Sequence, residues 1–289
     1  MSLLKIIILA VVQGLAELLP VSSSAHVVVA EKLLGLDPSS PPMTLLLVML
    51  HTGTMFAVIV YFWRRWRSTY FSSAPAVRNF AVLLVVATAL TAVVGEAIKI
   101  VIERTAFRNL PHAQIEDLFS HLELIAPALA AAGILILIAG LFEKRHSARA
   151  AAAAAGLNVK QAGIIGAVQG LCLPFRGFSR SGATISTGML LGVTKARAED
   201  FSFALAVILT PPVVAREALR LVQSARINGT ADLAAVGLYS VFGAVLAFLA
   251  GLLALKWLSR WLEGGRWYLF GIYCLVAAAA VTALHRAGY

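Results

Sequence analysis

The 289-residue sequence has little charge and few cysteines. Only 13% of its residues are Asp, Glu, Lys or Arg, whereas 60% are hydrophobic, and the mean hydropathy is +0.86. A soluble domain carries roughly one quarter charged residues, so this composition excludes a soluble domain and indicates a polytopic membrane protein. Cys172 and Cys274 both lie in apolar segments. Two such cysteines form neither a disulfide framework nor a metal knuckle, and we expect them to be packing residues.

The net charge of +10 does not indicate a nucleic-acid partner. The Lys and Arg residues cluster at the ends of apolar runs, where they ordinarily set orientation and contact lipid headgroups. We therefore expect membrane lipids as partners and no nucleic acid. At the N-terminus, Gln13 and Glu17 interrupt the apolar stretch, which disfavours a cleaved signal peptide.

Six runs are long enough to cross a bilayer as helices, which takes about 20 mostly apolar residues. They lie at 43–63, 79–102, 124–142, 201–222, 233–258 and 267–284. The connections between them are short and polar and leave no room for a soluble domain. We predict an all-α polytopic membrane protein with a single integral membrane domain over residues 1–289.

Two further apolar segments, residues 3–34 and 161–194, are too short and too interrupted to cross alone. Each reads as an apolar helix, a break containing Pro, a Ser-rich stretch and a second apolar helix. The word VQGL occurs at 12–15 and again at 168–171, and Leu-Pro follows in both. Non-helical backbone at membrane depth must be buried in protein or line a water-filled cavity. We therefore predict two re-entrant helix-loop-helix segments.

Each re-entrant segment is followed by three of the six spans. The chain therefore reads as two repeats, over about residues 1–145 and 157–289. Because three crossings are an odd number, the second repeat runs upside down relative to the first. This is an inverted-topology repeat.

The distribution of Lys and Arg predicts the orientation. If the connection at 64–78 is cytoplasmic, thirteen Lys and Arg lie on the cytoplasmic side and six on the other. The thirteen are Arg64, Arg65, Arg67, Arg78, Lys144, Arg145, Arg149, Lys160, Lys195, Arg197, Lys256, Arg260 and Arg266, and the six are Lys5, Lys32, Arg104, Arg108, Arg226 and Arg286. The positive-inside bias thus favours both termini outside the cytoplasm.

Both breaks contain hydroxyl side chains that can cap the helix that follows. Pro20 interrupts the first segment, since proline does not continue a helix comfortably. The hydroxyl candidates are Ser22, Ser23 and Ser24 in the first break and Ser179, Ser181 and Thr184 in the second. A helix N-terminus has unsatisfied N–H groups and the positive end of the helix dipole. Two such ends converging near mid-membrane favour an anion.

Charged side chains accompany these hydroxyls. Arg180 presents a planar fork matched to phosphate oxygens, and Arg176 is a candidate second cation. Gln13 and Glu17 share one helix face, and a carboxylate in an apolar segment is costly unless it is paired or functional. Candidate partners of Glu17 are Arg180, His26 and a divalent cation bridging to phosphate oxygens. The pattern predicts a phosphate or diphosphate ligand, and its alternative is a plain Glu17–Arg180 ion pair that ties the repeats together.

Other polar residues are expected to have structural roles. Glu96, Lys99 and Glu103 are spaced for one helix face and should pair with each other. His51 lies inside the first span, where an interhelical hydrogen bond is its ordinary role.

On these two motifs, and over essentially the whole chain, the sequence resembles the undecaprenyl-diphosphate phosphatases of the bacitracin-resistance type. QGLAELLPVSSSAH at 13–26 is similar to the family's (E/Q)-x-x-x-E element with its serines and histidine. GFSRSGATISTGMLLG at 177–192 is similar to its P-G-x-S-R-S-x-x-T element. Gln13 stands where Glu is often found, which leaves one fewer carboxylate for a metal. The usual Pro-Gly is here PFRG at 174–177, so Arg176 can add a phosphate contact.

The resemblance implies a bacterial inner-membrane enzyme whose active site faces the extracytoplasmic side. Such an enzyme hydrolyses undecaprenyl diphosphate to undecaprenyl phosphate and recycles this polyprenyl lipid carrier for peptidoglycan synthesis. A dependence on Mg²⁺ or Ca²⁺ and a fold of interlocked inverted repeats are also implied. The candidate catalytic residues are Glu17, Ser23, His26 and Arg180, with Glu17 also the candidate metal ligand. The candidate substrate ligands are Gln13, Ser22, Ser24, Arg176, Ser179, Ser181 and Thr184.

The spacing leaves three mechanisms open. Ser23 can be the nucleophile, with His26 or Glu17 accepting its proton; His26 can itself be the nucleophile; or Glu17 can activate a water. The competing class is a transporter or flippase of the lipid monophosphate, because inverted repeats with broken helices also build transporter sites. A structural scaffold would leave the embedded Glu17 and Arg180 without a reason. The sequence also leaves open the cation, the preferred prenyl length and whether the chain forms a homodimer.

Overall fold

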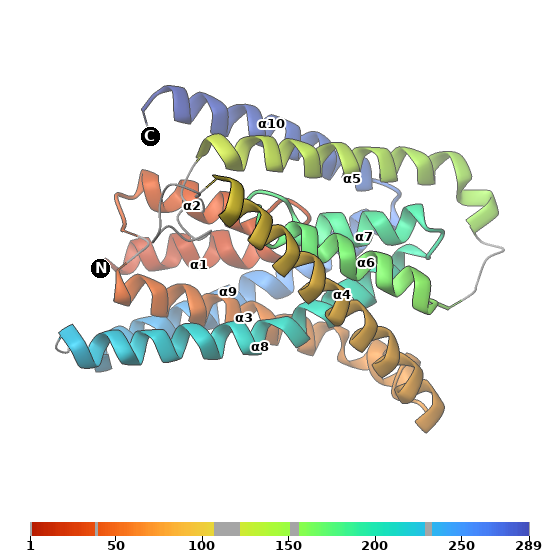
Figure 1. Ribbon diagram of the computed structural model, residues 1–289, viewed down its shortest axis with the longest axis horizontal. Helices are drawn as coiled ribbons and strands as arrows, with labels where there is room; N and C mark the ends of the chain where they lie inside the picture. Colours follow the sequence, from red (N-terminus) through yellow and green to blue (C-terminus); the bar gives the residue numbers. More distant parts are fainter. Residues whose placement is uncertain (1, 38–39, 107–121, 151–155, 229–232, 289) are drawn as a thin grey trace.

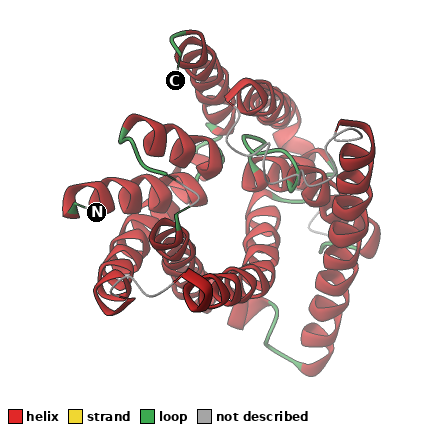
Figure 2. Cartoon of the chain, turned by 60° about the vertical axis from the view of Figure 1, so that its left-hand side comes forward, coloured by secondary structure: helices red, strands yellow, loops and turns green. Residues whose placement is uncertain are grey.

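A computed structural model describes residues 2–37, 40–106, 122–150, 156–228 and 233–288. Among these residues, helices joined by loops and turns are present and strands are absent (Figure 1 and Figure 2). Two short helices followed by three long ones occur twice along the chain. The helices are α1 (Leu3–Leu18), α2 (Ser23–Leu33), α3 (Pro41–Thr69), α4 (Ala74–Ala106), α5 (Leu122–Ala150), α6 (Val159–Cys172), α7 (Arg180–Leu190), α8 (Lys195–Asn228), α9 (Leu233–Glu263) and α10 (Trp267–Arg286). This order matches the predicted succession of broken segments and spans.

Within the described residues, six helices are long and apolar enough to cross a membrane. These candidate spans are Met43–Thr69, Ala74–Thr105, Leu122–Glu143, Lys195–Arg216, Gly237–Trp261 and Trp267–Arg286. The prediction of an all-α, six-span membrane protein is therefore confirmed. The count of charges behind the predicted orientation includes residues outside this description, namely Arg108 and the side chains of Lys144, Arg145, Arg149 and Arg226.

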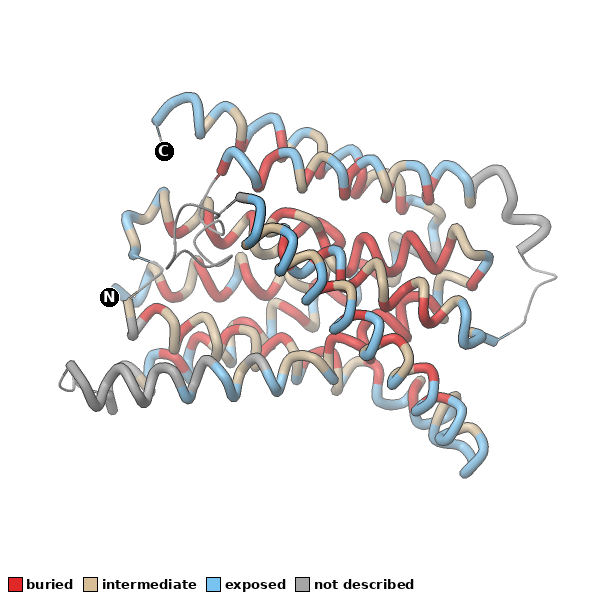
Figure 3. Tube along the Cα trace, in the orientation of Figure 1, coloured by how far each residue is buried: buried red, intermediate tan, exposed pale blue. Residues whose placement is uncertain are grey.

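The two halves of the chain interlock. α5 packs along α10, α3 packs along α9 and α8, α4 packs along α6, and α1 packs along α9. In Figure 1 the short helices α1, α2, α6 and α7 lie between the α5/α10 pair above and α3, α8 and α9 below, with α4 crossing in front. Figure 3 shows these short helices buried along much of their length, whereas the long helices are exposed on their outward faces. The interior thus holds the segments that carry both sequence motifs.

The two VQGL words perform the same packing in the two halves. A Cβ added to Gly14 of α1 would lie 2.7 Å from the Ala247 carbonyl oxygen of α9. A Cβ added to Gly170 of α6 would lie 2.6 Å from the Thr91 carbonyl oxygen of α4. Small residues let membrane helices approach closely, so each glycine presses a short helix against a long helix of the opposite half.

α8 begins at Lys195, earlier than the predicted span at 201–222. In the predicted topology, Lys195 and Arg197 belong to the connection at 195–197 that precedes this span. In the structure, Arg65 of α3 bonds Glu199 at 2.7 Å and also bonds Asp200, and both carboxylates are buried. An ion pair between helices satisfies these charges, so the helix extends through them.

The side chains expected to have structural roles fall as predicted, with one exception described below. Lys99 Nζ lies 4.0 Å from a carboxylate oxygen of Glu96 and 4.0 Å from one of Glu103. Cys172 and Cys274 are buried free thiols.

Candidate active site

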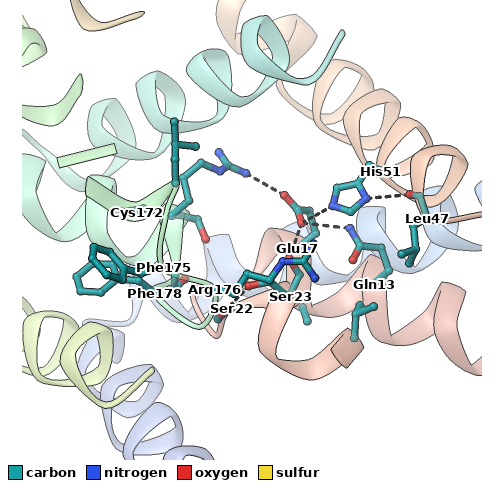
Figure 4. Close-up of a pocket in the computed structure, with 17 residues that line it drawn as sticks. Gln13, Glu17, Ser22, Ser23, Leu47, His51, Cys172, Phe175, Arg176 and Phe178 are labelled. Carbon is teal, nitrogen blue, oxygen red and sulfur yellow. Dashed lines mark hydrogen bonds and ion pairs between the residues drawn. The ribbon is translucent and has the colours of Figure 1, made fainter. Parts of the chain in front are cut away.

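A pocket of about 290 Å³ lies where the two broken segments meet (Figure 4). Its wall is built from α1, α2, α3, the end of α6, the loop between α6 and α7, and the start of α7. Both sequence motifs therefore line one cavity, although they are far apart in the chain. Its size is close to the lower end of the usual range for ligand sites.

Two helix N-termini open into this pocket. α2 begins after Ser22, whose Oγ accepts a hydrogen bond from the Ala25 N–H at 3.5 Å. α7 begins after Ser179, whose Oγ accepts from the Gly182 N–H at 3.2 Å. Ser22 has φ of 68°, a left-handed conformation that is rare outside glycine and concentrates at functional sites. The predicted convergence of two serine-capped helix starts is present at this pocket.

Glu17 accepts hydrogen bonds from three other side chains of the pocket. Its Oε1 accepts a hydrogen bond from Arg180 Nη2 at 3.1 Å, across 163 positions of sequence. Its Oε2 accepts from Ser23 Oγ at 2.6 Å and from Gln13 Nε2 at 3.1 Å. One carboxylate thus joins an arginine, a hydroxyl and an amide, as Figure 4 shows for Gln13, Ser23 and Glu17.

Two buried hydroxyls orient Arg180. Thr184 Oγ1 donates to the Arg180 carbonyl oxygen at 2.8 Å and lies 2.6 Å from Ser202 Oγ. The Ser202 carbonyl oxygen accepts from Arg180 Nη1 at 3.5 Å. Thr184, a predicted substrate ligand, is fully buried and is absent from the described lining of the pocket. Thr184 therefore orients Arg180 through its hydrogen bond to the Arg180 carbonyl and does not itself line the pocket.

The remaining predicted serines hold the two motifs together. Ser24 Oγ accepts a hydrogen bond from the Gly177 N–H at 3.2 Å. Ser181 Oγ donates to the Leu19 carbonyl oxygen at 3.3 Å. Both serines also line the pocket, so each is placed to bind a ligand and to fix the contact between repeats.

His26 does not belong to the described pocket lining. Its Nδ1 lies 2.7 Å from the Ser22 carbonyl oxygen, which can only accept, so Nδ1 carries the proton. Its Nε2 lies 2.7 Å from the Tyr273 hydroxyl and therefore accepts from it. The two rings are also stacked, with centroids 5.7 Å apart. His26 is thus placed to support the left-handed turn at Ser22.

His51 enters the pocket instead. Its Nε2 lies 3.7 Å from Glu17 Oε2, and its Nδ1 donates to the Leu47 carbonyl oxygen at 2.8 Å (Figure 4). We expected His51 to form a hydrogen bond to another helix with a purely structural role. The structure instead places its ring next to the Glu17 carboxylate. The available signal was a titratable side chain inside a span, which is by default a functional hypothesis.

The oxygen donors available for a divalent cation are few. Among the described residues there is no group of three or more His, Cys, Asp and Glu that could hold a metal. In the described lining, Glu17 is the one carboxylate, and Gln13 Oε1 is buried without a hydrogen-bond partner. Mg²⁺ sites commonly combine one or two carboxylates with substrate phosphates, so these two oxygens fit a cation whose remaining ligands come from the substrate.

The fold defines a polytopic membrane protein with a pocket between two helix N-termini. Residues 6–280 match the family model described as bacitracin resistance protein BacA. The chain belongs to this family.

Curated relatives match along nearly the whole chain. An Undecaprenyl-diphosphatase 2 of Acinetobacter baylyi is 55% identical over 287 residues, covering 98% of each chain. An Undecaprenyl-diphosphatase 2 of Burkholderia thailandensis is 34% identical, covering 96% of this chain and 95% of the relative. An Undecaprenyl-diphosphatase of Desulfosudis oleivorans is 32% identical, covering 93% and 94%.

Proposed function

We propose that this protein hydrolyses undecaprenyl diphosphate to undecaprenyl phosphate and inorganic phosphate, which recycles the lipid carrier for peptidoglycan synthesis. The observation that carries the proposal is the bond from Ser23 to Glu17, itself paired with Arg180, between two helix N-termini. A relative named for this activity is 55% identical over 98% of the chain. A hydroxyl with an adjacent base and a matched cation is the set that phosphoryl transfer needs.

Ser23 is the nucleophile in this mechanism. Its Oγ attacks the terminal phosphorus as Glu17 Oε2, 2.6 Å away, takes the hydroxyl proton. The bond between this phosphorus and the bridging oxygen breaks, and undecaprenyl phosphate leaves with the bonding electrons. Water then attacks the phosphorus of the phosphoserine, and the bond from phosphorus to Ser23 Oγ breaks. Glu17 returns its proton to Ser23 Oγ, and the oxygen and protons of the water leave with inorganic phosphate.

Glu17 couples proton transfer to charge stabilisation. Before the reaction its charge is offset by Arg180. Once Glu17 is protonated, the Arg180 guanidinium is free to act on the phosphoryl oxygens, where charge gathers in the transition state. The first-turn N–H groups of α2 and α7 add donors on the same side.

The geometry favours Glu17 over His26 as the base. Both ring nitrogens of His26 are engaged, with the Ser22 carbonyl and the Tyr273 hydroxyl. For His26 to act as base or nucleophile, the ring would have to break these bonds and turn towards the pocket. Ser23 and Glu17 are already in contact.

We expect a divalent cation, Mg²⁺ or Ca²⁺, to be required. Glu17 and Gln13 Oε1 would hold it, and when bound it neutralises phosphate charge. Treating the purified protein with a chelator should lower phosphate release at least about tenfold, and adding back either cation should restore it. Unchanged turnover after exhaustive chelation would remove the cation from the mechanism.

His51→Asn should slow phosphate release by about tenfold, or about 1.4 kcal/mol, because it removes the ring nitrogen that lies 3.7 Å from Glu17 Oε2 and acts electrostatically on this carboxylate. The asparagine amide can still donate to Leu47, but it lacks the ring nitrogen that faces Glu17. Steady-state kinetics on a prenyl diphosphate measure the effect. Wild-type kcat and KM in this variant would show that His51 only packs.

The protein is a multi-pass membrane protein. We place it in the bacterial inner membrane with the pocket open to the extracytoplasmic side, as the Lys and Arg distribution favours. Labelling of a single cysteine introduced at Arg78 or at Asp37 tests this orientation, because the two positions are predicted to lie on opposite sides of the membrane. Light scattering of the purified protein tests for a homodimer.

The activity itself is tested with detergent-solubilised, purified protein and a prenyl diphosphate. We expect release of one inorganic phosphate per molecule of prenyl monophosphate formed. Protein that releases none, but moves labelled lipid monophosphate between the leaflets of sealed vesicles, would be a transporter.

A further inference from the structure

A buried carboxylate, Glu31, lies on α2 outside the described lining of the pocket. Glu31 is only 1% exposed, and neither of its carboxylate oxygens has a hydrogen-bond partner among the described residues. An unpaired carboxylate at such a place is costly. The mechanism above does not use it.

The loop before α7 is docked on the side of α2 that carries Glu31. Ser24 and Glu31 are seven positions apart, two turns of the same helix, and so share one face. Ser24 Oγ accepts the Gly177 N–H at 3.2 Å. Gly177 has φ of +100°, and a Cβ there would lie 2.4 Å from the Ile125 carbonyl oxygen of α5. The loop is therefore held tightly between α2 and α5.

This docking brings Arg176, the residue before Gly177, to the pocket. Arg176 lines the pocket with Ser22 and Ser23 (Figure 4). The positive charge that acts on the Glu31 carboxylate is that of Arg176. Because the Glu31 oxygens accept no hydrogen bond from the described residues, this attraction acts through space.

We propose that Glu31 is a positioning residue that keeps Arg176 at the pocket and weakens its hold on the phosphate product. This inference rests on the proposed function. A diphosphate brings enough negative charge to draw Arg176 into contact, whereas inorganic phosphate must compete with Glu31 for the same guanidinium. Two pairs of a carboxylate and an arginine then act on the substrate. Glu17 with Arg180 serves the chemistry, and Glu31 with Arg176 serves binding and release.

Inhibition by inorganic phosphate tests the proposal. In Glu31→Gln, phosphate should inhibit turnover at about tenfold lower concentration, because the isosteric amide removes the negative charge that competes with phosphate for Arg176. In Arg176→Gln, phosphate should inhibit about tenfold more weakly and KM for the prenyl diphosphate should rise. Adding Glu31→Gln to Arg176→Gln should not change the inhibition by phosphate further. Glu96→Gln, which removes an exposed carboxylate of α4, is the matched control and should behave as wild type.

Thermal unfolding without substrate gives a second reading that needs no activity. Arg176→Gln should lower Tm, since it leaves Glu31 buried without a counter-charge, and the double variant should recover it. Calorimetric titration with pyrophosphate repeats the binding test if turnover is absent, so failure of the proposed function is separable from failure of this inference.

The proposal is overturned if Glu31→Gln leaves phosphate inhibition unchanged, or if it has the same effect with and without Arg176. Should Arg176→Gln not fold, folding of the double variant supports the coupling between Glu31 and Arg176. Failure of both variants to fold contradicts it.

Discussion

Ser23→Ala should release phosphate from a prenyl diphosphate at least about a thousandfold more slowly than the wild type. The alanine removes the attacking oxygen and the 2.6 Å hydrogen bond to Glu17, but leaves the Glu17–Arg180 pair intact. The effect should therefore fall on kcat and leave KM nearly unchanged. Steady-state kinetics in detergent measure both.

Ser68→Ala is a matched control for this variant, since Ser68 is an exposed serine that bonds the Arg65 carbonyl at 3.1 Å. It should behave as wild type. Substantial turnover by Ser23→Ala would exclude a serine nucleophile and favour a water activated by Glu17.

Arg180→Lys should lower kcat/KM by about a hundredfold, although it conserves the charge. The Arg180 fork spans two acceptors, the Glu17 carboxylate and the Ser202 carbonyl, with Nη2 and Nη1. A lysine is a single point donor and cannot keep both contacts while also meeting a phosphoryl oxygen. Since these contacts matter most in the transition state, kcat should fall more than KM rises.

The same exchange at exposed Arg78 of α4 controls for the general loss of a guanidinium. Arg78→Lys should leave kcat/KM unchanged. A fully active Arg180→Lys protein would mean that charge alone suffices and would remove the bidentate argument.

The sequence predicts the architecture well because hydrophobic length and punctuation are local properties. Six apolar runs and two breaks around Pro20 and Pro174 can be read directly from the chain. The early start of α8 could not be read this way. Glu199 and Asp200 look like a polar connection until Arg65, more than 130 positions away, pairs with them. Long-range pairing of charges overrides local polarity.

The pairing of Glu17 with Arg180 could be predicted because each is a costly charge in an apolar segment and so needs a partner. The contact of Glu17 with Ser23 is different, since the two residues are six apart across a helix break and no helical period relates them. His51 was underrated for a related reason: periodicity shows which face of a helix a residue occupies, but not which neighbour that face meets.

His26 and Glu31 show the same limit from the other side. The family motif puts His26 among the predicted catalytic residues. In the structure its ring bonds the Ser22 carbonyl oxygen and the hydroxyl of Tyr273, which lies 247 positions away and belongs to neither motif. Glu31 precedes Lys32 near the end of an apolar segment, where charge is ordinarily solvated. In the structure the Glu31 side chain is buried.

The proposed phosphoryl transfer requires one diphosphate site between Arg180 and the starts of α2 and α7. A structure of the protein with a non-hydrolysable prenyl methylenediphosphonate tests this directly. The terminal phosphonate should lie within hydrogen-bond distance of Ser23 Oγ and Arg180. Binding of the headgroup elsewhere, for example in the second cavity between α5 and α10 beside Glu123 and His285, would contradict it.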